Sequence, residues 1–311
     1  MPIVDGHADT LSRLDSECRS LGEASTRGQS DLGRLLRAGV SLQILAICVE
    51  SAMDAEAGLR RLLALIDRFY LDLAGHAEAR LVGAKADLDW LGPERVGFML
   101  AIEGADPLGK RPELLRILHR LGVRMLGLVW NWRNEFAAGA MAPDGGGLTG
   151  VGRELIGIAE ATGIVVDLAH INRQGFWDVL ETATKPIVVS HANARAVCEH
   201  PRNLDDDQLR ALAAAGGVVG VNLYPPFLTN ASRATVDDIL RHLDHLLRVA
   251  GPESVGFGLD FDGIETTPVD LPDIAALSVL LRAIDRLGLP PPVRKGLLGG
   301  NWLRILRQIL P

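Results

Sequence analysis

Residues 150–170 read GVGRELIGIAEATGIVVDLAH, and this stretch contains the unit from which the fold is built. Residues 150–162 have helical periodicity, and Gly163 after them is a typical helix stop. Residues 164–168 form a short, mostly apolar and β-branched run, as expected for a parallel strand that is buried on both faces. A helix that leads into such a strand indicates an α/β protein with a parallel sheet.

The same alternation continues along the whole chain, because short β-branched runs are each followed by a segment with helical periodicity. The eight candidate strands are residues 2–6, 42–49, 96–102, 125–129, 164–168, 187–189, 218–222 and 255–259. Strand and helix repeated eight times predict an α/β fold, a (β/α)8 barrel of the TIM type, with residues 1–311 as one domain. An open doubly wound sheet is the alternative, but no strand leads into a GxGxxG or Walker A loop.

The composition excludes several classes of protein. Hydrophobic residues make up 48% and charged residues 23%, so the chain can bury a large core. Its net charge of −7 argues against a nucleic-acid partner, which needs a basic surface. No apolar run is long enough to span a membrane, the opening MPIVDGHADT does not resemble a signal peptide, and the three cysteines are far apart. These features predict a cytoplasmic protein with reduced thiols and no membrane partner.

Polar residues stand at the ends of five candidate strands. They are His7 and Asp9 after the first strand, Glu103 after the third, His170 after the fifth, His191 after the sixth and Asp260 after the eighth. A single histidine or aspartate at a strand end is more often a cap or a loop contact. In a barrel, however, these ends meet at one rim, so three histidines and several carboxylates converge there and indicate a metal centre.

Imidazole and carboxylate ligands without thiolate suit zinc, or else manganese, cobalt or iron. With Glu103 shared, the ligands suffice for two sites of about three protein ligands each, and two metals that bridge a hydroxide are typical of a hydrolase. The other five histidines are interpreted as structural: His76, His119, His200, His242 and His245. The last two lie three residues apart on a charged helix, for which we expect a solvated face.

Seven segments, in this order, resemble the renal or membrane dipeptidase family, the M19 metallopeptidases of the amidohydrolase-like barrels. They are DGHADT (5–10), AIEGADPL (101–108), GLTGVGRELIGIAEATGIVVDLAH (147–170), SHANARAVCEHPRNLDDDQL (190–209), VGVNLYPPFL (219–228), GFGLDFDGIE (256–265) and GGNWLRIL (299–306). One such motif is weak, whereas seven in the family's order are specific.

The resemblance implies two Zn²⁺ ions per chain, bridged by Glu103 rather than by a carboxylated lysine. One ion is then held by His7, Asp9 and Glu103, and the other by Glu103, His170 and His191. Asp260, which opens the DFDG-type motif, is implied to handle the proton of the bridging water. Family members are commonly homodimers, and we expect a homodimer by analogy.

The resemblance also implies a substrate pocket. Arg202, eleven residues after His191, is expected to bind the C-terminal carboxylate of a dipeptide, and Tyr224 to line the same pocket. The alternative for Arg202 is a surface residue that caps the acidic run at 205–207. Trp130 replaces a histidine of vertebrate members that contacts the substrate carbonyl, and we expect Trp130 and Asn131 to face the substrate.

The sequence therefore predicts a dinuclear zinc dipeptidase that hydrolyses small L-Xaa–L/D-Xaa dipeptides through a metal-bridging hydroxide. The alternative is a related metal-dependent hydrolase or tailoring enzyme for another small amide, lactam or lactone, which has no use for Arg202 as a carboxylate clamp. A metal-binding protein without catalysis is a third hypothesis, but none of the expected ligands is missing. A nuclease fits the acidic chain poorly.

Overall fold

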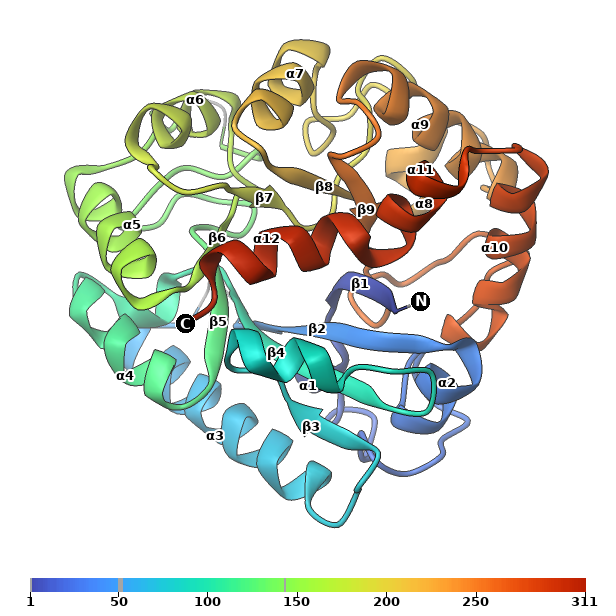
Figure 1. Ribbon diagram of the computed structural model, residues 1–311. Coiled ribbons are helices and arrows are strands. Elements are labelled where there is room, and N and C mark those ends of the chain that lie inside the picture. Colours follow the sequence, from blue (N-terminus) through green and yellow to red (C-terminus); the bar gives the residue numbers. More distant parts are fainter. Residues whose placement is uncertain (1, 50–52, 143) are drawn as a thin grey trace.

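Eight parallel strands form a closed barrel in the computed structural model, which describes residues 2–49, 53–142 and 144–311 (Figure 1). The strands are β1 (Ile3–Ala8), β2 (Val40–Cys48), β4 (Val96–Glu103), β5 (Val123–Gly127), β6 (Val165–Asp167), β7 (Val188–Val189), β8 (Val218–Val221) and β9 (Val255–Phe257). They run in the order β2-β1-β9-β8-β7-β6-β5-β4, and pairing between β2 and β4 closes the barrel. Each overlaps a candidate strand of the sequence, so the predicted (β/α)8 barrel is confirmed.

Helices surround the barrel, as Figure 1 shows. The longer ones are α2 (Leu32–Ala38), α3 (Ala55–Leu73), α5 (Gly150–Thr162), α6 (Arg173–Thr182), α7 (Asp206–Ala214), α9 (Val236–Val249) and α10 (Leu277–Arg286). The shorter ones are α1 (Thr10–Arg13), α4 (Leu115–Arg120), α8 (Pro225–Leu228) and α11 (Pro291–Lys295). The unit in residues 150–170 forms as predicted: Thr149 caps α5, and Gly163 ends it in the left-handed conformation at φ 78°.

The register of β4 places one carboxylate at the C-terminal end of the barrel. All eight residues of β4 are buried, and β2 pairs with it from Leu42 opposite Gly97 to Cys48 opposite Glu103. Glu103 also pairs with Gly127, the last residue of β5. The apolar residues of β4 thus fix the strand in the core, and its terminal carboxylate faces the rim.

A ninth strand, β3 (Ala79–Leu81), and a closing helix, α12 (Asn301–Ile309), go beyond the predicted elements. β3 pairs with the first residues of β4, and the later residues of β4 pair with β5. α12 lies across the barrel end that faces the viewer in Figure 1. Its Trp302 is fully buried and packs so closely that a Cβ at Gly6 would lie 2.2 Å from the indole ring. The predicted C-terminal segment is therefore a helix that covers the N-terminal end of the barrel.

The solvated face expected for His242 and His245 is wrong. His242 is fully buried: its Nδ1 accepts a hydrogen bond from the Ala194 N–H, and its Nε2 lies 3.0 Å from the Leu228 carbonyl oxygen. His245 is buried with its Nε2 2.7 Å from Asp206. Both histidines lie on the inner side of α9, whose charged residues had suggested the opposite.

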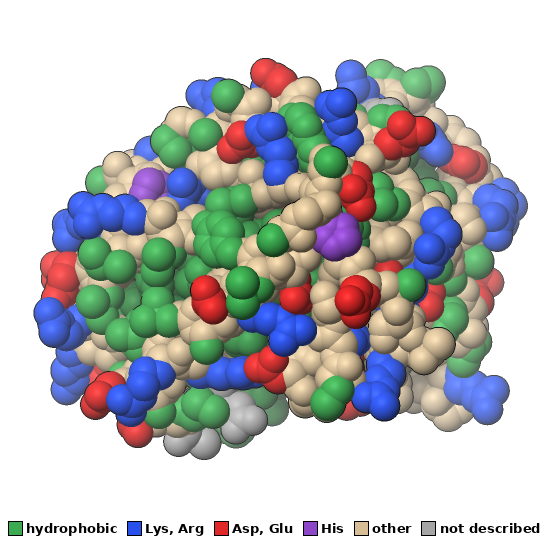
Figure 2. All heavy atoms as spheres, turned by 90° about the horizontal axis from the view of Figure 1, so that it is seen from below, with side chains coloured by type: hydrophobic (Ala, Val, Ile, Leu, Met, Phe, Trp, Pro, Cys, Tyr) green, Lys and Arg blue, Asp and Glu red, His purple; other side chains and the backbone are tan. Residues whose placement is uncertain are grey.

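The outer surface mixes apolar and charged side chains on the side of the barrel shown in Figure 2. The large apolar residues exposed on α3 and α4 are Leu63, Tyr70, Leu71 and Ile117. Within the described ranges, no helix combines the length and apolarity that crossing a membrane requires.

Candidate metal centre

The six chemistry-bearing residues predicted at strand ends lie together at the C-terminal end of the barrel. His7 is in β1 and Glu103 ends β4, while the other four follow strands β1, β6, β7 and β9. Their donor atoms form three groups within which all atoms lie within 4.8 Å of one another. These groups are His7, Asp9 and Glu103; Glu103, His170 and His191; and His7, His191 and Asp260. All six residues are buried.

Glu103 is at the centre of this cluster. Its Oε1 lies 2.7 Å from Nε2 of His170 and 3.5 Å from Nε2 of both His7 and His191. One carboxylate oxygen thus faces the ε-nitrogens of three histidines from three strands. This is the arrangement expected of a ligand shared by two metal sites.

The backbone adopts uncommon conformations where it presents these groups. His170 and Asp260 have φ values of 69° and 66°, in the left-handed region that non-glycine residues seldom occupy. Backbone hydrogen bonds hold both residues, from the Ala140 N–H to the His170 carbonyl and from the Asp260 N–H to the His7 carbonyl. Such strain is common at functional sites because the surrounding structure maintains it.

Gly263 is required by the close approach of two carboxylates. A Cβ at this position would lie 2.3 Å from Oδ2 of Asp9 and 2.4 Å from Oδ1 of Asp260. Any side chain here would displace one of them. The DFDG-type segment therefore needs its glycine to keep both carboxylates at the site.

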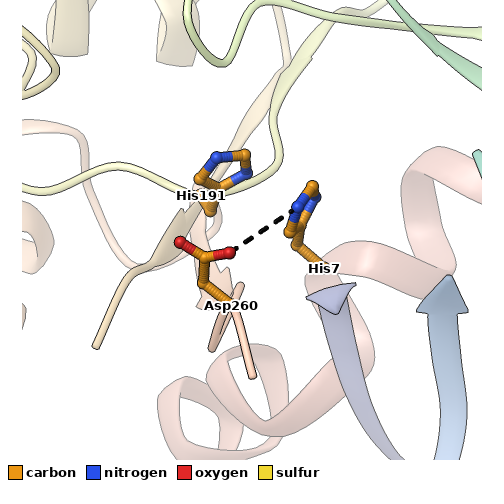
Figure 3. Close-up of side chains that lie close together, drawn as sticks. All are labelled: His7, His191 and Asp260. Atoms are coloured by element: carbon orange, nitrogen blue, oxygen red, sulfur yellow. Dashed lines mark ion pairs between the residues drawn. The ribbon is translucent and has the colours of Figure 1, made fainter. Parts of the chain in front are cut away.

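The carboxylates repel one another in this buried place. Burial raises the pKa of Asp9 to about 6, with a further contribution from the charge of Glu103. Burial raises the pKa of Asp260 to about 8, and Asp9 and Glu103 add to the effect although His7 opposes it. His7 faces Asp260, with 3.8 Å between Nε2 and Oδ1 (Figure 3). Burial lowers the pKa of His7, but the surrounding carboxylates outweigh it and raise the value to about 10.

The other two histidines are favoured in their neutral form. Burial lowers the pKa of His170 well below its usual range, with help from the charges of Arg202 and His7. Burial does the same to the pKa of His191, with help from His7 and His170. Neutral imidazole is the form that binds metal.

The residues of this centre fit a divalent metal. Asp9 Oδ1 is buried without a hydrogen-bond partner, which costs free energy unless a cation occupies the place beside it. Several carboxylates crowd into one buried cluster, and a cation would relieve their repulsion. Nitrogen and oxygen donors without thiolate match zinc and similar ions.

A pocket of about 620 Å³ opens beside this cluster. Arg202 lines it and is only 5% exposed, with Nη2 2.9 Å from Nε2 of His191 and the guanidinium 5.7 Å from the Phe227 ring centre. Its Nε is buried without a partner. The acidic run that was the alternative partner is engaged elsewhere, because Asp205 binds Arg173 at 2.7 Å. The surface-capping alternative for Arg202 is therefore wrong.

Tyr224, Trp130 and Asn131 also line the pocket. Tyr224 stacks edge-on against Phe227, and the Trp130 ring centre lies 6.0 Å from that of His170. The sequence predicts that Asn131 faces the substrate. Its Oδ1 lies 2.8 Å from His170 Nδ1, so the side chain also forms a hydrogen bond with a candidate metal ligand.

Sequence reasoning missed two further polar contacts of the site and one residue that lines the pocket. Asn222 donates a hydrogen bond to Asp260 Oδ2 at 2.8 Å, and Ser190 lies 2.8 Å from His191 Nδ1. His200, interpreted as structural, lines the pocket. Asn222 and Ser190 follow strands, so the strand-end rule that found the histidines could have found them too.

The chain is similar to known proteins in sequence and in structure. A sequence model described as "Membrane dipeptidase (Peptidase family M19)" matches residues 1–310. The "Uncharacterized protein in pqqA 5'region" of Klebsiella pneumoniae is 38% identical over 79% of this chain and 94% of its own length. "Dipeptidase aclJ" of Aspergillus oryzae is 30% identical over 99% of this chain and 78% of its own.

A solved structure extends the likeness to three dimensions. It is the crystal structure of a metallo peptidase from Rhodobacter sphaeroides liganded with a phosphinate mimic of the dipeptide L-Ala-D-Ala. It superposes with a TM-score of 0.92 at 29% identity, covering 99% of both chains.

Proposed function

The chain belongs to the membrane dipeptidase family, peptidase family M19, and is a peptide-bond hydrolase; from this premise we propose that it cleaves small dipeptides at a centre of two zinc ions. The observation that carries the proposal is the position of Glu103. Its Oε1 lies within 3.5 Å of three histidine ε-nitrogens, and it belongs to two of the three donor groups.

Two of the three donor groups match the ligand sets that the family resemblance implies. One ion would be held by His7, Asp9 and Glu103, and the other by Glu103, His170 and His191. When bound, two such ions lower the pKa of a water molecule and polarise the carbonyl of the scissile bond. The chain's own groups then have to move a proton and hold the substrate.

Asp260 is the group that takes the proton from the attacking water and returns it to the leaving amine. Its Oδ2 accepts a hydrogen bond from Asn222, and its Oδ1 faces His7 at the cluster. The Asn222 contact fixes the carboxylate orientation and leaves Oδ1 for proton transfer. Burial in the cluster raises the pKa of Asp260 towards neutrality, which suits a general acid–base group.

Arg202 binds the C-terminal carboxylate of the dipeptide. The guanidinium is buried at the pocket with Nε unpartnered, so a substrate carboxylate would satisfy an existing deficit. Tyr224 lines the same pocket. Trp130 stands where vertebrate members of the family have a histidine. Its indole N–H can donate one hydrogen bond to the substrate.

The substrate class is small L-Xaa–L/D-Xaa dipeptides. The pocket of about 620 Å³ is of the size that small ligands occupy. The Rhodobacter sphaeroides relative holds a mimic of L-Ala-D-Ala, which supports tolerance of a D-residue at the second position. The homodimer and the cytoplasmic location stay predictions from the sequence.

A dipeptide library hydrolysed by zinc-loaded protein tests this function. We expect turnover of several dipeptides, L-Ala-D-Ala included, and none of N-acetylated or longer peptides of the same residues. Turnover of amides, lactams or lactones without any dipeptide cleavage would contradict the proposal and favour the alternative hydrolase.

A further inference from the structure

Ser190 lies between two histidines that belong to different proposed metal sites. It follows β7 and is fully buried. Its Oγ is 2.8 Å from Nδ1 of His191 and 3.4 Å from Nδ1 of His7. The ring centres of these histidines are only 3.9 Å apart, so a single hydroxyl faces both rings on the side away from Glu103.

The Asp167 carboxylate holds the Ser190 backbone in place. Its Oδ1 accepts hydrogen bonds from the backbone N–H groups of Ala169, at 3.0 Å, and of Ser190, at 2.8 Å. These two contacts fix the backbone from which the Ser190 hydroxyl reaches the two rings.

A serine hydroxyl has one proton and two acceptor lone pairs, so it can form hydrogen bonds with both Nδ1 atoms at once. With Nδ1 held in this way, both imidazoles direct Nε2 towards Glu103, at 3.5 Å from its Oε1 in each case.

We propose that Ser190 is a positioning residue that fixes the ring orientation of His7 and His191 together, with Asp167 holding its backbone. This inference rests on the proposed dinuclear centre, since it assigns one outer contact to both halves of it. His170 is held separately, because its Nδ1 faces Asn131 Oδ1 at 2.8 Å. Outer contacts of this kind typically contribute 10- to 100-fold in metal affinity.

Zinc titration against a chromophoric chelator tests the proposal by comparing Ser190→Ala with Asn131→Ala. Ser190→Ala should weaken zinc binding about 10- to 100-fold at both sites. Asn131→Ala should weaken only the site that contains His170. Ser190→Thr keeps the hydroxyl and should restore most of the affinity at both sites. Equal affinities in wild type and Ser190→Ala would overturn the proposal.

Nitrogen-15 spectra of the histidine rings in zinc-loaded protein give a second readout. We expect the Nδ1 signals of His7 and His191 to change in Ser190→Ala and that of His170 to stay, because only the first two contact Ser190 Oγ. Unchanged His7 and His191 signals would refute the proposal. If Ser190→Ala does not fold, Ser190→Cys serves as the test, since its weaker hydrogen-bonding group should produce the same changes. A wild type that binds fewer than two zinc ions would instead contradict the proposed function.

Discussion

Replacing Arg202 separates a dipeptidase from a general amide hydrolase. The guanidinium is 5% exposed and has an unpartnered Nε, so its pairing with a substrate carboxylate takes place largely out of water. Truncating one partner of such a pair costs about 2–5 kcal/mol, because the other charge is left desolvated. At about 1.4 kcal/mol per tenfold, Arg202→Ala should lower kcat/KM for a dipeptide by roughly 30- to 4000-fold.

The assay compares a dipeptide with its C-terminal amide. Wild type should cleave the amide poorly because it presents no anion, and Arg202→Ala should add little further loss for it. Arg202→Lys keeps the charge without the guanidinium fork and should recover only part of the dipeptide activity. Arg173→Ala, which removes an exposed arginine paired with Asp205, is the matched control. Zinc content is measured in each variant, because Arg202 also contacts His191.

Two results would refute this reasoning. One is a wild type that cleaves the acid and the amide equally well. The other is an Arg202→Ala variant, with its zinc content intact, that loses the same factor on both substrates. Either would show that Arg202 does not read the carboxylate, and would favour the alternative amide, lactam or lactone hydrolase.

Two further predictions concern proton transfer and pH. Asp260→Asn should retain both metals and the hydrogen-bonding position beside Asn222 but lose turnover by at least about a hundredfold; near-wild-type kinetics in fully metallated protein would mean that Asp260 only supports its loop. Burial lowers the pKa of His242 to about 4, so the folded state resists protonation of this ring whereas the unfolded chain accepts the proton. The free energy of unfolding therefore falls as the pH is lowered from about 6.5 to about 4. The loss attributable to this group is about 3 kcal/mol, and urea unfolding at pH 7 and pH 4 should show a smaller fall for His242→Gln than for wild type. Equal falls would contradict that role.

The barrel and its metal-type residues were predictable because both follow from local patterns. Buried parallel strands are apolar at consecutive positions, so eight of them stood out, and polar residues at their ends marked the rim. Glu103 is an example: the apolar run before it identifies β4, and the fold alone brings it to the other ligands. The strand β3 was missed because its sequence, Ala-Arg-Leu, has no β-branched residue and has a charged residue at its centre.

The contacts between neighbouring loops were not predictable in the same way. Ser190 stands next to His191 in the sequence, but its position against His7 depends on how β7 and β1 approach across the barrel. The burial of His242 depends on the loop at Ala194, which supplies a backbone partner that no helical pattern reveals. Such details follow from tertiary packing, which a single sequence encodes without displaying.

The metal content of the protein tests the central claim most directly. After removal of bound metal and reconstitution with excess zinc, elemental analysis of the desalted protein should give two equivalents per chain. Glu103→Gln should bind zinc more weakly at both sites, because it weakens the one anionic ligand that they share. One equivalent or none in the reconstituted wild type, or a Glu103→Gln variant that keeps two tightly bound ions, would contradict a dinuclear centre bridged by Glu103.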